Sequence, residues 1–177
     1  MRPYLEPGPA QLVFSLFSGD TSLLFAGLEM LEGVFGPMAW TGLVYPFEET
    51  NYYEREFGTG LQRTFCGFQA LVSQDRLVEA KLKAIELERE WSILEKRRLN
   101  LDPGLLTPER LVLATRKNFT HRIYLGSGVF ADLTLIFQAG SFRPLPWSYP
   151  DYAASESIAF WNEVRRMLLR RINWSGA

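Results

Sequence analysis

Residues 12–35 have the sequence LVFSLFSGDTSLLFAGLEMLEGVF, and this stretch sets the first two elements of the fold. Residues 12–17 are short, apolar and aromatic, which is typical of a buried strand. Asp20 or Thr21 can cap a following helix, which Gly36-Pro37 ends. The chain therefore begins with a strand that is followed directly by a helix.

The same kinds of pattern predict the remaining elements. Further strands are expected at 40–47, 61–68, 97–101, 121–125 and 129–137, and further helices at 73–94, 107–115 and 155–172. Asp102-Pro103-Gly104 is expected to end the strand at 97–101 as a turn. The helix at 73–94 has two sets of apolar residues at helical spacing, namely Val78, Leu82, Ile85 and then Leu87, Trp91, Leu94.

The first six elements follow the order β-α-β-β-α-β. This order predicts an α+β fold with a ferredoxin-like antiparallel sheet, to which a C-terminal β-hairpin and a C-terminal helix are added. A length of 177 residues fits a single domain, 1–177.

Composition excludes several classes of protein and site. One cysteine rules out an intrachain disulfide, and one cysteine with one histidine cannot supply a Cys/His zinc site. With 19 basic and 20 acidic side chains, no global charge attracts nucleic acid. The start of the chain does not have the pattern of a signal peptide, and no run approaches the ~20 apolar residues of a membrane helix. We therefore expect a cytoplasmic protein without a membrane partner, whose oligomeric state stays open.

The best candidate site is residues 97–132, RRLNLDPGLLTPERLVLATRKNFTHRIYLGSGVFAD. Titratable groups this dense amid strand-like sequence are costly unless they pair or face a ligand. A three-residue hairpin loop at 126–128 would place Arg122 opposite Asp132, and His121 on the other face of the sheet. Arg122 and Asp132 then form either an ordinary cross-strand ion pair or an anion-binding fork that the carboxylate orients.

The candidate catalytic residues are His121, Asp132 and Asp102. His121 is either a general acid or base, or a hydrogen-bonded histidine at the end of a buried face. Asp102 either caps a turn or joins Asp132 to hold Mg²⁺. No G-x-S-x-G motif offers a nucleophile for a Ser-His-Asp triad.

The candidate ligand-binding residues are Arg116, Lys117, Arg122, Tyr124 and Trp147. The three bases lie close to His121 in the sequence and suit a phosphate, although a solvated loop has the same composition. The register places Tyr124 opposite Phe130. The ring of Trp147 can stack on a base or simply cover an edge of the core.

Four segments resemble an uncharacterised prokaryotic family, domain of unknown function 4416. They are Asn100–Gly104 (NLDPG), Leu111–Lys117 (LVLATRK), His121–Gly126 (HRIYLG) and Leu145–Tyr152 (LPWSYPDY). The family more often has glutamate where this chain has Asp132. Some of its members carry an automatic "GTP-binding" label, but this chain has no G-x-x-x-x-G-K-[ST] loop to hold a nucleotide.

These observations favour a small domain that binds a phosphorylated ligand, a nucleotide or RNA through residues 115–132. One alternative is an enzyme acting on a phosphate ester or nucleotide, with His121 as the acid or base. Another is a structural module that binds a partner through the last helix and the aromatic segment.

Overall fold

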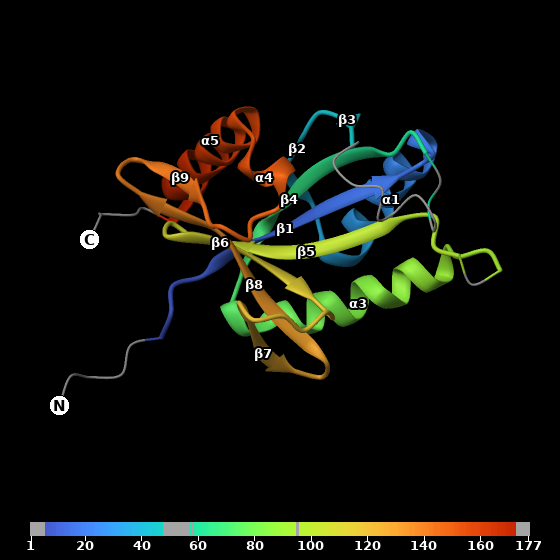
Figure 1. Ribbon diagram of the computed structural model, residues 1–177, viewed down its shortest axis with the longest axis horizontal. Helices are drawn as coiled ribbons and strands as arrows, with labels where there is room; N and C mark the ends of the chain where they lie inside the picture. Colours follow the sequence, from blue (N-terminus) through green and yellow to red (C-terminus); the bar gives the residue numbers. More distant parts are fainter. Residues whose placement is uncertain (1–5, 48–56, 58, 95, 173–177) are drawn as a thin grey trace.

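The computed structural model describes residues 6–47, 57, 59–94 and 96–172 (Figure 1). Its strands are β1 (Ala10–Ser18), β2 (Met38–Thr41), β3 (Tyr45–Pro46), β4 (Gln62–Val72), β5 (Asn100–Leu106), β6 (Arg110–Thr115), β7 (Arg122–Gly126), β8 (Val129–Gln138) and β9 (Ser141–Pro144). Its helices are α1 (Thr21–Phe35), the short 3₁₀ helix η1 (Gln74–Arg76), α3 (Leu77–Glu90), α4 (Pro150–Ala153) and α5 (Ser155–Ile172). No helix among the described residues is long and apolar enough to cross a membrane.

One antiparallel sheet joins all nine strands of the described residues. Its order is β2-β4-β1-β5-β6-β8-β7, with β3 also paired to β4 and β9 to β8. The α+β class with a single antiparallel sheet is therefore confirmed. Nine strands replace the six expected from the sequence, because the segment at 107–115 contains β6, β9 is an addition, and the strand expected at 40–47 is divided into β2 and β3.

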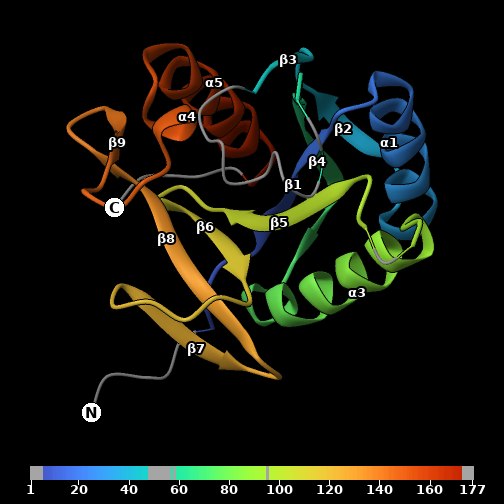
Figure 2. The same ribbon diagram turned by 45° about the vertical axis from the view of Figure 1, so that its right-hand side comes forward.

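Helices cover both faces of this sheet (Figure 2). Helices α1 and α3 pack on one face, where Phe14, Leu16 and Leu101 lie in the core. Helices α4 and α5 pack on the other face, where Trp161 is fully buried beside Phe65. The apolar stripe of α5 thus packs within the domain. It is not available to bind a partner, as the hypothesis of a partner-binding module requires.

The segment Asp102-Pro103-Gly104 does not form the expected turn. It lies inside β5, where Asp102 pairs with Ser15 and Pro103 with Phe14 of β1. A proline is tolerated here because its missing N–H belongs to the edge of β5 that faces away from β1, and β6 does not pair with that edge at Pro103.

Residues 107–115 do not form a helix either. Thr107 donates its backbone N–H to the Arg110 carbonyl at 3.0 Å, so that Pro108 and Glu109 form a tight turn between β5 and β6. Thr107 resembles a helix cap in sequence, but its side-chain oxygen accepts from the Glu109 N–H within this turn. Residues 110–115 then extend as a strand between two neighbours, β5 and β8.

Strands β5 and β6 separate part of the way along their length. They pair only from Gly104 to Leu106, opposite Leu113 to Leu111. Beyond this point β6 continues along β8 as far as Thr115, whereas β5 stays with β1. Gly104 stands at the point of separation, where a Cβ atom would lie 2.8 Å from the Val112 carbonyl oxygen. The sheet consequently opens between residues 100–103 and residues 114–117.

Candidate functional site

A cavity of about 580 Å³ occupies this opening in the sheet. It is lined from one face by α3 and from the other by residues 149–152, which include the start of α4. Most of its charged lining is basic. The basic side chains are Arg63, Lys81, Arg89, Arg97, Arg116, Lys117 and Arg122, and the acidic ones are Glu88, Asp102, Asp132 and Asp151.

Lys81 reaches Asp102 through the opening. The Lys81 side chain is 7% exposed, and its ammonium lies 2.9 Å from Asp102 Oδ1, while Asn100 donates to Asp102 Oδ2 at 2.7 Å. Burial opposes the ionisation of Asp102, but the nearby Lys81 charge and these hydrogen bonds outweigh it and hold the pKa of Asp102 below its ordinary value. Both oxygens of this carboxylate are thus occupied by donors.

Glu88 lies two turns further along α3 and binds the same strand. Its Oε1 accepts from the Leu101 backbone N–H at 2.7 Å, and its Oε2 lies 3.3 Å from Arg97. Burial raises the pKa of Glu88, against the influence of Lys81. The Leu101 N–H belongs to the edge of β5 that β6 has left, so Glu88 supplies the acceptor that a neighbouring strand would otherwise provide.

Arg63 of β4 forms another wall of the cavity. Its guanidinium makes a buried ion pair with Asp151 of α4 and lies 3.7 Å from the centre of the Phe47 ring. Arg63 is 5% exposed, and its Nε has no hydrogen-bond partner among the described residues. This cation is therefore fixed in position by Asp151 and Phe47 but keeps one donor unused.

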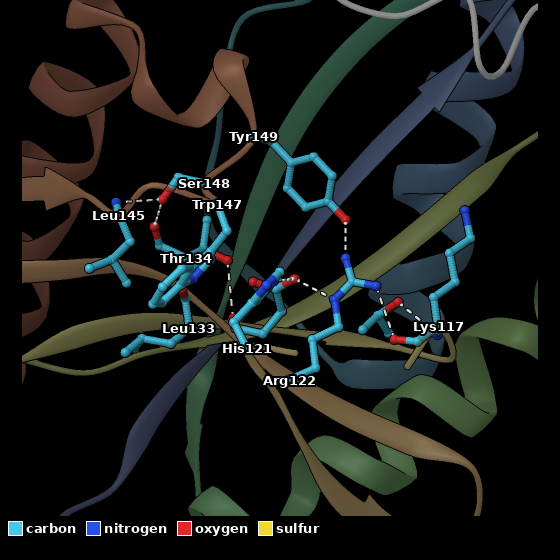
Figure 3. A network of polar contacts seen from close by, with 11 residues as sticks. Lys117, His121, Arg122, Leu133, Thr134, Leu145, Trp147, Ser148 and Tyr149 are labelled. Carbon is cyan, nitrogen blue, oxygen red and sulfur yellow. Dashed lines mark hydrogen bonds and ion pairs between the residues drawn. The ribbon is translucent and has the colours of Figure 1, made fainter. Parts of the chain in front are cut away.

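Arg122 and His121 lie close together at the hairpin (Figure 3), where Asp132 contacts both of them. The predicted pairing of Arg122 with Asp132 across β7 and β8 is confirmed. Asp132 Oδ2 accepts from Arg122 Nε at 2.8 Å and lies 3.3 Å from His121 Nε2. The other nitrogens of Arg122 donate to the Lys117 carbonyl and to the Tyr149 hydroxyl, each at 2.9 Å. Arg122 is therefore held by three different acceptors.

The hairpin register predicted that His121 lies on the opposite face of the sheet from Arg122 and Asp132. This prediction is wrong, because His121 contacts Asp132. Strand β7 begins only at Arg122, whose N–H donates to the Phe119 carbonyl, so His121 belongs to a turn and strand alternation does not apply to it. Its ring stacks on Trp147, with centroids 4.9 Å apart and an angle of 10° between the planes. His121 is not among the residues that line the cavity, and in the described part of the chain it is connected to the lining through Asp132.

The aromatic segment at 145–149 is anchored along β8. Trp147 Nε1 donates to the Leu133 carbonyl at 2.9 Å, and the Ser148 hydroxyl donates to the Thr134 carbonyl. These two bonds place Trp147 against His121 and bring the Tyr149 hydroxyl to Arg122, as Figure 3 shows. Burial raises the pKa of Tyr149 although Arg122 opposes it, so at neutral pH the phenol is protonated.

The structure brings together most of the candidate residues but not all of them. Asp102, Arg116, Lys117, Arg122 and Asp132 line the one cavity. The other three candidates are not among the residues that line it: His121 and Trp147 lie behind Asp132, and Tyr124 is 60% exposed beside Phe130.

The carboxylates do not suit the Mg²⁺ hypothesis for Asp102 and Asp132. Both accept hydrogen bonds from basic side chains, namely Lys81 and Arg122. Within the described ranges, no group of three or more His, Cys, Asp or Glu side chains is placed to hold a metal ion.

The comparison with known proteins identifies the family. The sequence profile of a family described as "Domain of unknown function (DUF4416)" matches residues 8–168. The chain belongs to this family. No curated protein and no solved structure matches the chain. The match spans every described strand and all but the last residues of α5, so the cavity of this DUF4416 domain lies within the matched region.

Sequence analysis missed Lys81, Glu88, Arg63 and Asp151. The buried residues of α3 are Leu77, Ala80, Lys81, Ala84, Leu87 and Glu88, whose spacing is that of a core-facing stripe. Lys81 and Glu88 are charged residues within this stripe, and this is the feature of the sequence that could have identified them as site residues. Of the expected apolar residues only Leu87 lies in the stripe, and Leu82 is 37% exposed.

Proposed function

We propose that the cavity binds a small phosphorylated molecule. The observation that carries this proposal is the charge of the lining, where seven basic side chains face four carboxylates and each carboxylate is already paired with a base. Three of the bases, Arg89, Arg116 and Lys117, are exposed and stand at the cavity mouth. A positively charged concave surface concentrates field lines and favours an anion.

Size and charge distribution favour a small molecule over RNA. About 580 Å³ falls within the range of ligand pockets. The chain as a whole carries a formal charge of −1, so the basic excess is local to the cavity. RNA binding relies instead on an extended basic surface that follows the phosphate backbone.

The proposal assigns roles to candidate residues between Asp102 and Asp132. Arg122 is the anion fork, because Asp132, Tyr149 and the Lys117 carbonyl fix its plane and so reduce the entropy lost on binding. Arg116 and Lys117 add charge at the mouth. Among the catalytic candidates, Asp132 and Asp102 face the cavity, whereas His121 would act through Asp132 as a positioning residue.

A thermal-shift titration tests the proposal. Inorganic phosphate, glycerol 3-phosphate and AMP should each be compared with sodium chloride at equal ionic strength, and at least one phosphate compound should raise the Tm of the full chain. Arg116→Ala and Lys117→Ala should each weaken that binding about three- to tenfold. Lys83→Ala is the matched control, because Lys83 is on α3 but does not line the cavity. The absence of a specific rise with every phosphate compound would overturn the proposal.

We also propose that β5, β1, β4 and β2, with α1 and α3 on one face, form a ferredoxin-like core within a single domain. The antiparallel order β2-β4-β1-β5 supports this proposal. Strands β6 to β9 and helices α4 and α5 would then be additions that build the second half of the cavity wall.

A further inference from the structure

Asp132 presents a buried acceptor that no donor of the described residues uses. Its side chain is 2% exposed, and both donors that reach it, Arg122 Nε and His121 Nε2, go to the same oxygen, Oδ2. The other oxygen, Oδ1, is buried and has no hydrogen-bond partner among the described residues. A buried carboxylate oxygen without a donor is costly, and such groups are rare in folded proteins.

Arg63 presents the complementary feature in the same cavity. Its Nε–H is a buried donor without an acceptor in the described part of the chain, although its guanidinium pairs with Asp151. Apart from the atoms of the Arg63–Asp151 ion pair, the described part of the lining therefore contains one unused acceptor and one unused donor, both on side chains that are more than nine-tenths buried. Neither can be satisfied by rotation without breaking an ion pair.

A phosphate group alone does not satisfy this pair of atoms. The oxygens of an ionised phosphate ester accept hydrogen bonds, so they suit the bases but are repelled by Asp132 Oδ1. A hydroxyl group both donates and accepts, and it can therefore give its proton to a carboxylate oxygen. A ligand that carries both groups would satisfy the bases and Asp132 Oδ1 together.

We propose that the ligand is a phosphate monoester of a polyhydroxylated molecule, one of whose hydroxyls donates to Asp132 Oδ1. The phosphate would lie among the exposed bases at the mouth, and the hydroxylated part would enter the buried end. This inference rests on the proposed phosphate site and adds the chemistry of the rest of the ligand. Arg63 Nε is the second polar contact available to a hydroxyl there.

A matched pair of compounds tests it by isothermal titration calorimetry on the full chain. Glycerol 3-phosphate and propyl phosphate have the same carbon chain and phosphate but differ in two hydroxyls. We expect glycerol 3-phosphate to bind about tenfold more tightly, the effect of one hydrogen bond to a charged group. Titrations with glycerol alone and with inorganic phosphate measure the affinity for the hydroxylated part and for the phosphate separately.

Two variants test whether Asp132 is the source of the preference for glycerol 3-phosphate over propyl phosphate. Asp132→Asn places an amide N–H where Oδ1 stands, because the remaining oxygen is needed by Arg122. A hydroxyl can still accept from this amide, but the bond no longer involves a charged group, so the ratio of the two affinities should fall to about three or less. Lys117→Ala should weaken both phosphate compounds by a similar factor and leave their ratio unchanged. If Asp132→Asn proves unfolded, the ratio measured on the unaltered chain still decides.

The outcomes separate the inference from the function on which it rests. Equal affinity for glycerol 3-phosphate and propyl phosphate would overturn the hydroxyl contact and leave the phosphate site intact. No binding of inorganic phosphate or of either ester would overturn both. A preference for glycerol 3-phosphate that is undiminished in folded Asp132→Asn would show that another residue holds the hydroxyl, and would also overturn the inference.

Discussion

Lys81 and Glu88, two turns apart on α3, bind the two backbone polar groups of a single residue of β5. Lys81 Nζ donates to the Leu101 carbonyl at 3.1 Å, and Glu88 Oε1 accepts from the Leu101 N–H at 2.7 Å. In a complete sheet both groups would pair with the next strand. The helix thus replaces the missing neighbour of β5 at Leu101, at the place where β6 leaves the strand.

Replacing Lys81 should destabilise the protein strongly. Lys81→Met keeps the length of the side chain but leaves the Leu101 carbonyl unpaired and Asp102 without its cation. Removing one partner of a buried ion pair typically costs about 3–5 kcal/mol. Urea unfolding should show this loss, and Lys83→Met on the outer side of α3, where Lys83 pairs with exposed Glu86, should change the stability by less than ~0.5 kcal/mol.

Asp102 should make stability depend on pH in the acid range. Its pKa is lower in the folded protein than in the unfolded chain, where it is about 3.9, so ionised Asp102 contributes stability above that pH. This contribution is lost as the pH falls through the lower, folded pKa. Asp102→Asn should therefore be less stable than the unaltered chain at pH 7, by about 1–3 kcal/mol.

The comparison of the unaltered chain with the Asp102→Asn variant across pH provides the check. Their free energies of unfolding should converge as the pH falls below about 4, because a protonated carboxyl group and the amide that replaces it have similar interactions with Lys81. A difference that stays constant from neutral pH to about pH 3 would show that the carboxylate charge is not the source of the stabilisation.

Gly104 should tolerate no side chain. A Cβ atom would lie 2.8 Å from both the Val112 carbonyl oxygen and a methyl group of Leu113, and the backbone oxygen can move only if β5 and β6 move apart. We expect Gly104→Ala to lower the stability by about 1–3 kcal/mol. Gly33→Ala is the matched control, because Gly33 is inside α1 with open space around it, and this substitution should raise the stability by about 0.5–1 kcal/mol.

The local part of the fold was accessible from sequence. Periodicity and caps located β1, α1, β8 and α5 closely, and the turn glycines fixed the register that sets Arg122 against Asp132. The bulge between Tyr124 and Gly126 shifts only the end of the hairpin, so it leaves this pairing unchanged. These are short-range properties, determined by residues adjacent in the chain.

The errors arose where a distant strand overrode a local preference. Asp102-Pro103-Gly104 favours a turn by itself, but pairing with β1 over the whole of β5 keeps it extended. Likewise, His121 was placed by alternation from a strand that begins one residue later, and its position is set by the Trp147 ring from another segment. No pattern within residues 97–132 contains that information.

The candidate site was found in part for the same reason. Its hairpin half, from Arg116 to Asp132, was visible as a run of charges in one segment. Its other half comes from Arg63, Lys81 and Glu88, which are isolated in sequence within otherwise ordinary strand or helix patterns. Charged residues at core positions of an amphipathic helix are therefore candidate site residues in their own right.

The separation of β5 and β6 has a consequence for how such a domain can diversify. The hollow is made by the paths of two strands and not by small side chains, so replacing the side chains that line it changes its chemistry without closing it. Backbone pairing from Gly104 to Leu106 keeps the strands joined at one end whatever those side chains are. The charge at the cavity mouth can therefore change with the exposed residues Arg116 and Lys117, whereas Lys81 and Asp102 contribute both to the cavity lining and to the stability of the fold.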